Sequence, residues 1–324
     1  MNNSKVELHR QKSFANEIVL VDGPTRAGKS LIHPILSSYK NVEILTSDNL
    51  FENVAYLYHN KKIECDAAVS LLRCQLQMRI YYTMLSRNVN FKTGDYSGVF
   101  WNVNPLRYFK RLFFLKDKDV LEAIIKEKPL VQIQTHDALS HIDILFKSFD
   151  KGLKIIEMIR NPVGLIYSNY AKGYGERESK EPTKIMFTIK YKDDILPWYA
   201  HGWEDQFLSM SRMDRVIHYI SRRLENIYTS YNNLNDSQKS QILFVPYEKF
   251  LTSPSKYLIE IENLISREPT KLTKRALSHA GCPANINDSD LKDKTAKIKA
   301  LCTKESFHIL SDLLEFHHNF ASKH

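Results

Sequence analysis

The stretch at residues 18–30, IVLVDGPTRAGKS, decides the fold. Its first half, Ile18–Val21, is apolar like a buried strand, and its second half has the spacing G-x4-G-K-S of a phosphate-binding loop. Glycines let the backbone wrap closely around an anion, and a helix that starts just after them adds the positive end of its dipole. The stretch therefore predicts a nucleotide-type phosphate ligand. The candidate contacts are Gly23, Pro24, Thr25, Arg26, Ala27, Gly28, Lys29 and Ser30.

The composition is that of an ordinary globular protein. Of 324 residues, 43% are hydrophobic and 26% are charged, with only 10 Gly and 11 Pro. Because no linker or repeat interrupts the chain, we expect a single domain over 1–324, with a flexible polar segment at 1–15. That segment lacks the apolar core of a secretory signal, and no stretch is long enough to span a membrane. We therefore expect a cytoplasmic protein with no membrane partner.

The charge balance is basic, at 46 − 37 = +9. The basic residues are spread along the chain and form no tract interleaved with aromatic residues, so nucleic acid is not the expected partner. A positive field that converges on a phosphate site explains the charge better.

The four cysteines are too few for a disulfide framework in a chain of this length and lack metal-ligand spacing. We expect buried free thiols at Cys65, Cys74, Cys282 and Cys302.

Short apolar runs separated by helical patterns predict the architecture. Five runs read as buried parallel strands: Ile18–Val21, Val42–Leu45, Leu130–Gln134, Lys154–Ile159 and Ile242–Pro246. Two helices are clearest, Asp66–Leu85 with Ala67, Leu71, Cys74 and Met78 on its apolar face, and Met210–Tyr231 with Met213, Ile217, Ile220 and Leu224 on its face. The pattern predicts an α/β fold of the P-loop nucleotide-binding type, with a central parallel β-sheet flanked by helices on both faces.

Ligands of such sheets bind beyond the carboxyl ends of the strands. Four polar residues follow predicted strands there: Arg26, His136, Arg160 and Tyr247. After its strand, Arg160 begins the segment Arg-Asn-Pro-x5-Ser, in which Pro162 suits the first turn of a helix and Ser168 lies two turns along it. A guanidinium and a hydroxyl so placed could hold a second phosphate. Alternatively, the arginine could form an ion pair with a carboxylate while the serine faces solvent.

Four segments together resemble the sulfotransferases that use 3′-phosphoadenosine-5′-phosphosulfate (PAPS). The phosphate loop and the segment from Arg160 to Ser168 are similar to that family's two signature segments. Gln134-Thr135-His136 resembles its Lys-Thr-His, and Tyr247-Glu248-Lys249-Phe250 resembles a later segment beginning Tyr-Glu. The four segments fall in the family's order between residues 23 and 254.

The resemblance implies a sulfuryl transfer from PAPS to a hydroxyl of a small-molecule or carbohydrate acceptor, with no metal. The loop would bind the 5′-phosphosulfate, and Arg160 and Ser168 would bind the 3′-phosphate. His136 would be the catalytic base, Arg26 would contact the sulfuryl group, and Tyr247 would lie near the adenine. Lys29 and Arg26 would balance the charge that builds on the bridging oxygen.

The chain departs from the family's pattern at several positions. Lys29 stands where the family has threonine, Leu31 where an aromatic residue often stacks on adenine, and Gln134 where it has lysine. The family's C-terminal Arg-Lys-Gly is missing, and its 3′-phosphate contact could come instead from Lys294, Lys297 or Lys299.

The acceptor site is less well marked in the sequence. Two stretches could line it or could be buried connections, namely the polar stretch 87–97 and the aromatic stretch 196–203. The aromatic stretch follows an expected mobile loop at 172–184. Asp137 and His141 are alternatives to His136 as the base.

Two other functions stay open on the sequence alone. A P-loop small-molecule kinase would use Mg²⁺ with ATP, held in part by Asp48 or Asp137. A non-catalytic nucleotide-binding module would need no base at His136.

Overall fold

A computed structural model describes residues 6–9, 12–95, 97–285 and 288–323. The segment 1–15, predicted to be flexible, lies partly outside these residues, and its flexibility stays a prediction. Where it is described, it contacts a helix, since the Leu8 N–H donates to Asp66 at 2.7 Å and Gln77 donates to Ser13 at 2.9 Å.

The described residues form a parallel sheet of five strands in the order β2-β3-β1-β4-β7. Its strands are β1 (Ile18–Asp22), β2 (Thr46–Ser47), β3 (Val131–Gln134), β4 (Leu153–Ile159) and β7 (Ile242–Pro246). A separate antiparallel hairpin joins β5 (Thr188–Tyr191) to β6 (Asp194–Pro197). Ile18–Val21 is completely buried at the centre of the sheet, as an apolar run between two neighbouring strands requires.

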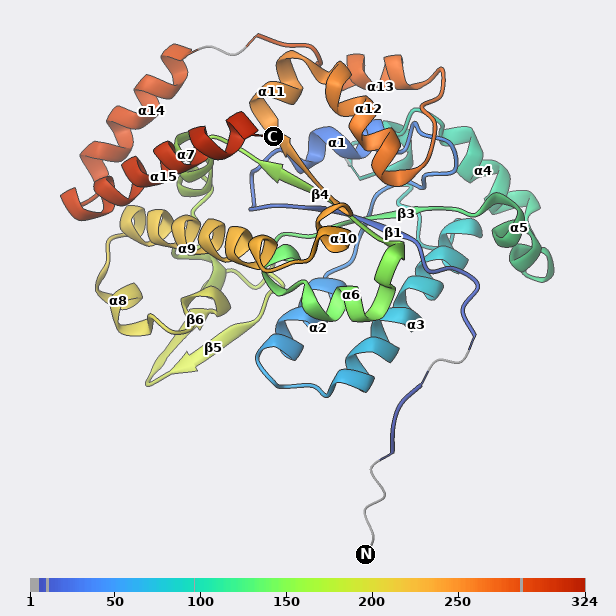
Figure 1. Cartoon of the computed structure of the whole chain (residues 1–324), viewed down its shortest axis with the longest axis horizontal. Coiled ribbons are helices and arrows are strands. Elements are labelled where there is room, and N and C mark those ends of the chain that lie inside the picture. The colour runs from blue at the N-terminus through green and yellow to red at the C-terminus, as the bar shows by residue number, and fades with distance from the viewer. Residues whose placement is uncertain (1–5, 10–11, 96, 286–287, 324) are drawn as a thin grey trace, which may run out of the picture.

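Helices cover both faces of this sheet, as predicted (Figure 1). Helices α1 and α12 pack on one face, while α6 packs on the other with α3 behind it. The helices are α1 (Lys29–Leu36), α2 (Leu50–His59), α3 (Cys65–Met84), α4 (Pro105–Phe114), α5 (Val120–Glu127), α6 (Asp143–Phe149), α7 (Pro162–Ala171), α8 (Glu204–Ser209), α9 (Arg212–Asn232), α10 (Asp236–Lys239), α11 (Tyr247–Thr252), α12 (Pro254–Ile265), α13 (Thr273–His279), α14 (Asp288–Leu301) and α15 (Lys304–Lys323). The α/β fold with a central parallel sheet is thereby confirmed.

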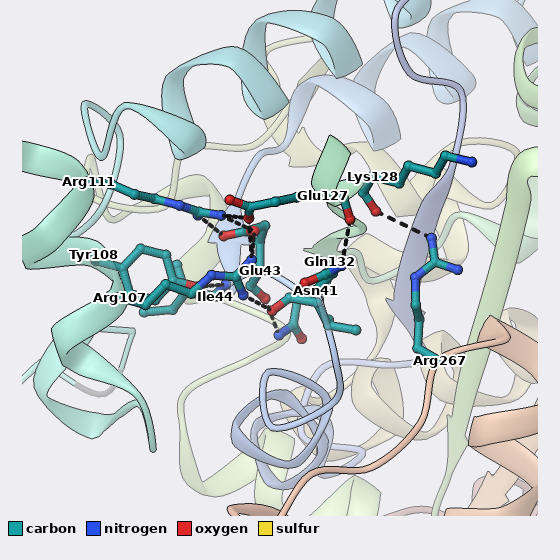
Figure 2. Close-up of polar contacts among 11 residues, drawn as sticks. Asn41, Glu43, Ile44, Arg107, Tyr108, Arg111, Glu127, Lys128, Gln132 and Arg267 are labelled. Atoms are coloured by element: carbon teal, nitrogen blue, oxygen red, sulfur yellow. Dashed lines mark hydrogen bonds and ion pairs between the residues drawn. The ribbon is translucent and has the colours of Figure 1, made fainter. Parts of the chain in front are cut away.

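One predicted strand is wrong. Val42–Leu45 makes a single bridge, between Val42 and Leu130, and the strand proper is Thr46–Ser47. Side chains here form hydrogen bonds with backbone groups that would otherwise pair with a neighbouring strand. The Ile44 N–H donates to the Tyr108 hydroxyl at 2.6 Å, and the Glu43 carbonyl accepts from Gln132 at 2.9 Å (Figure 2). Pairing therefore resumes only beyond Leu45.

The two predicted helices are present, but one predicted face is wrong. In α9 the predicted apolar face is buried, whereas in α3 Leu71 and Met78 are exposed and Ala68, Leu72 and Ile80 are buried instead. Because α3 carries apolar residues around its whole circumference, its packing partners decide which side is buried.

The cysteine prediction holds only in part. All four cysteines are free, but Cys65 is exposed and only Cys282 is fully buried. No helix among the described residues is long and apolar enough to cross a membrane.

Candidate functional site

The carboxyl ends of four adjacent strands gather the predicted site residues at one edge of the sheet. β1 leads into the phosphate loop, β3 into His136, β4 into Arg160 and β7 into Tyr247. Val21 of β1 lies opposite Gln134 of β3, so the loop and His136 leave the sheet side by side. The predicted position at the strand ends is confirmed.

Backbone conformation explains why the loop needs its glycines. Gly23 and Gly28 have φ values of +121° and +100°, in the region that favours glycine. A Cβ at Gly23 would lie 2.4 Å from the Met158 carbonyl oxygen, and one at Gly28 would lie 2.3 Å from the Tyr247 ring. The loop is thus held against β4 on one side and against Tyr247 on the other.

The remaining loop residues divide between buried and exposed positions. Pro24 and Ala27 are buried, with the Ala27 N–H donating to the Pro24 carbonyl at 3.0 Å, whereas Arg26 and Ser30 are exposed. Arg26 has a φ of +74°, an uncommon conformation for a residue with a side chain. Its guanidinium is therefore on the solvent side, free to meet an anion.

Lys29 points back across its own loop. Its Nζ donates to the carbonyls of Gly23 and Pro24 at 2.5 and 2.9 Å. The side chain is 5% exposed, and burial lowers the pKa of Lys29 to about 8. The buried cation thus lies at the start of α1, where a phosphate would also meet the helix dipole.

Arg160 lies directly beside the loop. Its Nη1 donates to the Arg26 carbonyl at 2.8 Å, and its guanidinium lies 4.8 Å from the centre of the Tyr247 ring. Its Nε is buried without a hydrogen-bond partner, and no carboxylate forms an ion pair with it in the described part of the chain. Of the two possibilities that the sequence leaves open, this arrangement favours an anion site over an ion pair with a carboxylate.

Ser168 lies two turns along α7, as predicted, and a helix with four lysines and three aspartates lies beside it. Helix α14 packs on α7. Its Lys294 and Lys297 place their ammonium groups 5.9 and 5.6 Å from the ring centre of Tyr167, the neighbour of Ser168. Lys299 lies instead over Phe307.

His136 is held by a carboxylate that the sequence did not point to. Glu52 accepts the His136 backbone N–H at 3.1 Å and lies 3.4 Å from its Nδ1. Burial and the nearby charge of Lys29 lower the pKa of His136, against the opposing effect of Glu52. Burial alone would raise the pKa of Glu52, but the contacts with His136 outweigh it and lower that pKa to about 2. At neutral pH the pair is thus a neutral imidazole beside a carboxylate.

His136 opens onto a cavity of about 350 Å³. Its lining combines polar groups with an aromatic cluster. The polar groups belong to Thr25, Glu52, Asp137, Tyr219 and Arg223, and the cluster consists of Tyr56, Phe187 and Trp198. Trp198 comes from the predicted stretch 196–203, and Thr183 and Lys184 come from the expected mobile loop. No described residue of 87–97 lines this cavity, and Phe91 packs against Phe109 of α4, so of the two possibilities left open for this stretch the structure favours a connection.

Arg223 is the second residue that the sequence gave no reason to select. It is 5% exposed within α9, donates to the Tyr219 hydroxyl at 2.7 Å and lies 3.3 Å from Asp137. Like Glu52 on α2, it lies inside a helix and reaches the site only through tertiary packing. An isolated charge on the otherwise apolar side of α9 is the only local signal.

The acidic residues that a kinase would need are already engaged. Asp48 forms an ion pair with Arg79 and accepts from Gln75, both at 2.5 Å. Asp137 accepts from Ser140 at 2.6 Å besides its contact with Arg223. The third candidate base, His141, lies in the aromatic wall of the cavity, where burial lowers its pKa to about 3.

No protein-family model matches this chain, and no curated protein sequence matches it. Solved structures similar to it are sulfotransferases. The sulfotransferase domain from the curacin biosynthetic pathway is 12% identical with a TM-score of 0.47, covering 93% of this chain and 98% of that domain. The sulfotransferase domain of the Synechococcus PCC 7002 olefin synthase is 11% identical with a TM-score of 0.45, covering 95% and 98%. Sulfotransferase STF9 from Mycobacterium avium is 12% identical with a TM-score of 0.42, covering 88% and 76%.

Proposed function

We propose that this chain is a PAPS-dependent sulfotransferase that moves a sulfuryl group to a hydroxyl of a small-molecule or carbohydrate acceptor, with residues 1–324 acting as one domain. One observation carries the proposal: a loop of the phosphate-binding pattern, an arginine without a carboxylate partner among the described residues, and a histidine held by a carboxylate lie at the same sheet edge. The anion site combines the phosphate loop with Arg160, and the histidine opens onto a cavity of acceptor size.

The residues present fit a nucleotide with phosphates at two positions. Loop amides, Lys29 and Ser30 would hold the 5′-phosphosulfate, with Arg26 on the sulfuryl group. Arg160, whose Nε has no partner, would hold the 3′-phosphate together with Ser168 and Lys297, which lies above Tyr167. Lys294 could join them only by leaving its ion pair with Asp290. Tyr247, which packs on Gly28, would border the adenine. PAPS supplies a sulfuryl group on a good leaving phosphate.

The transfer is an in-line displacement in which His136 moves the proton. The acceptor oxygen forms a bond to sulfur while its proton passes to the neutral imidazole of His136. The bond between sulfur and the bridging oxygen breaks, and its electron pair leaves with adenosine 3′,5′-bisphosphate. Arg26 and Lys29 balance the charge on that oxygen. Glu52 is a positioning residue, which holds Nδ1 and stabilises the imidazolium that forms.

Two alternatives are less well supported. A Mg-ATP kinase is disfavoured because Asp48 and Asp137 are each held by an arginine. A non-catalytic nucleotide module gives no reason for a histidine held by a carboxylate at the mouth of a cavity.

A labelled-transfer assay tests the proposal. The wild-type protein is incubated with sulfur-labelled PAPS and a panel of phenols, alcohols and sugars, and labelled product is measured. We expect product from the wild type and a loss of about 100-fold or more in His136→Asn, since a general base contributes that much. The control is binding of adenosine 3′,5′-bisphosphate, which should be unchanged in His136→Asn. The proposal would be overturned if the wild-type protein did not bind labelled PAPS.

Glu52→Gln distinguishes positioning from a structural role. Because Glu52 raises the pKa of His136, its loss should lower kcat and also move the acid limb of the pH profile to lower pH. An unshifted limb with lower activity would mean that Glu52 only supports the fold.

A further inference from the structure

Helix α4 is attached to the protein by its charged side. Arg107 and Arg111 each contact Glu43 at 2.7 Å, and Arg111 also contacts Glu127 at 2.7 Å. Figure 2 shows both arginines pointing inward to these carboxylates. Glu43 is completely buried, so removing either arginine would leave a buried charge without its partner. Tyr108, on the same side, is also buried.

Away from these contacts, and at its C-terminal end, α4 exposes large apolar residues. Phe113 and Phe114 are 73% and 78% exposed, and Leu106 is 67% exposed. Phe109 connects this side to Phe100, whose ring centre is 5.9 Å away. We call the exposed group the α4 apolar surface: Phe100, Trp101, Leu106, Leu112, Phe113 and Phe114.

This orientation is the reverse of that of an ordinary surface helix, which buries its apolar stripe and exposes its charges. The network around Glu43 fixes α4 in this orientation, so the exposure is built into the fold. Six large exposed apolar side chains within fifteen residues, Phe100 to Phe114, mark an interaction site.

Charge indicates what this surface contacts. Residues 97–116 contain four basic residues and no Asp or Glu. Lys110 lies exposed on α4 among the apolar residues, and Lys116 lies just beyond its end. Asp117, which follows, is ion-paired with Arg87 at 2.5 Å. Phenylalanine, tryptophan and leucine with neighbouring lysines are typical of helices that lie in the interface of an anionic membrane.

A second copy of the chain fits this surface less well. A two-fold contact through α4 would bring each Lys110 close to its counterpart, and the segment carries no acidic side chain to offset it. We propose, in place of the expectation from the sequence that there is no membrane partner, that the α4 apolar surface docks the protein on a membrane that carries anionic lipid headgroups. The protein would bind peripherally, since none of the described helices could span a bilayer.

Vesicle flotation of the full chain tests the proposal, with vesicles of phosphatidylcholine alone or mixed with phosphatidylserine. We expect the wild type to float with the mixed vesicles, and much less with phosphatidylcholine alone. Phe113→Ser combined with Phe114→Ser should weaken partitioning at least about tenfold, because two large apolar side chains no longer enter the interface. Lys110→Glu should weaken binding to the mixed vesicles about fivefold or more.

Ile259→Ser is the matched control, since Ile259 is an apolar residue 61% exposed on α12. It should float like the wild type, and all variants should keep the far-ultraviolet spectrum and melting temperature of the wild type. The proposal fails if the wild type does not float, or if the double Phe variant floats as well as the wild type. It also fails if light scattering shows a wild-type dimer that the double variant dissociates, since the surface would then be a self-interface.

Discussion

At the residue scale, the charge of Lys29 depends strongly on its surroundings. Its Nζ is enclosed by two loop carbonyls, and burial brings its pKa down from 10.5 to about 8. The unfolded chain holds this proton more tightly, so between pH 8 and 10.5 this residue makes the folded state more stable as the pH rises. An anion bound in the loop would raise the pKa of Lys29 again, because it favours the protonated side chain.

Binding of adenosine 3′,5′-bisphosphate should therefore weaken above pH 8. Once Lys29 loses its proton in the free protein, binding must take up a proton, and the affinity should fall up to about tenfold per pH unit. Calorimetric titrations between pH 7 and 9.5, in buffers of different ionisation enthalpy, measure both the affinity and the proton uptake.

Lys29→Arg is the control for this prediction, because arginine stays charged throughout that range. Its affinity should be nearly constant with pH. A wild-type affinity that is equally constant would contradict the role given to Lys29.

Residues also differ in how well sequence alone predicts them. His136, Arg160 and Tyr247 could be located because each follows a predicted strand within two residues. Glu52 and Arg223 could not, since both lie within helices, and only the packing of α2 and α9 brings them to the cavity. The role of the stretch 87–97 stayed open because polar composition alone does not show which part of the molecule a loop reaches.

At the element scale, the phosphate loop and the start of α11 form one packed unit. The Tyr247 ring occupies the space that a side chain at position 28 would need, and the φ of Gly28 is itself unfavourable for any other residue. This contact joins the ends of β1 and β7, which are not neighbours in the sheet.

Gly28→Ala should therefore destabilise the protein by about 2–4 kcal/mol, the sum of backbone strain and overpacking. In the double variant, Tyr247→Ala should remove the overpacking contribution of Gly28→Ala and leave its backbone strain. Urea denaturation of the two single variants and the double variant measures both contributions.

Gly202→Ala is the matched control, since Gly202 has a φ of +85° and no atom within 4 Å of the added Cβ. It should show the backbone strain alone, about 1–2 kcal/mol. Equal losses for Gly28→Ala and Gly202→Ala would mean that the Tyr247 contact contributes nothing.

The sequence predicts a strand or helix correctly where its local pattern and the tertiary contacts favour the same structure. The strands β1, β3, β4 and β7 lie within a residue of their apolar runs. The prediction at Val42–Leu45 failed because Tyr108 and Gln132, both distant in sequence, take its backbone groups. The orientation of α4 also could not be predicted from the sequence, since an amphipathic pattern does not tell which side of a helix faces the protein.

At the scale of the whole molecule, the sheet gathers one half of the candidate site and the helices supply the other. Strand ends bring the loop, His136 and Arg160 to one edge, and helices add Glu52 and Arg223 around the cavity. The α4 apolar surface lies on a helix that contributes nothing to this cavity. Binding to a membrane could therefore be removed by substitution without altering the site.

The loop and Arg160 together are proposed to hold a nucleotide with phosphates on both its 5′ and its 3′ positions. Titration calorimetry at pH 7 with adenosine 3′,5′-bisphosphate, adenosine 5′-monophosphate and Mg-ATP tests it most directly. We predict that the bisphosphate binds at least about tenfold more tightly than the monophosphate, since Arg160 adds a charge-assisted hydrogen bond. Arg160→Gln should remove most of that difference, and chelation of metal should leave it unchanged. Equal affinity for the two adenosine nucleotides, or tighter binding of Mg-ATP, would contradict the account.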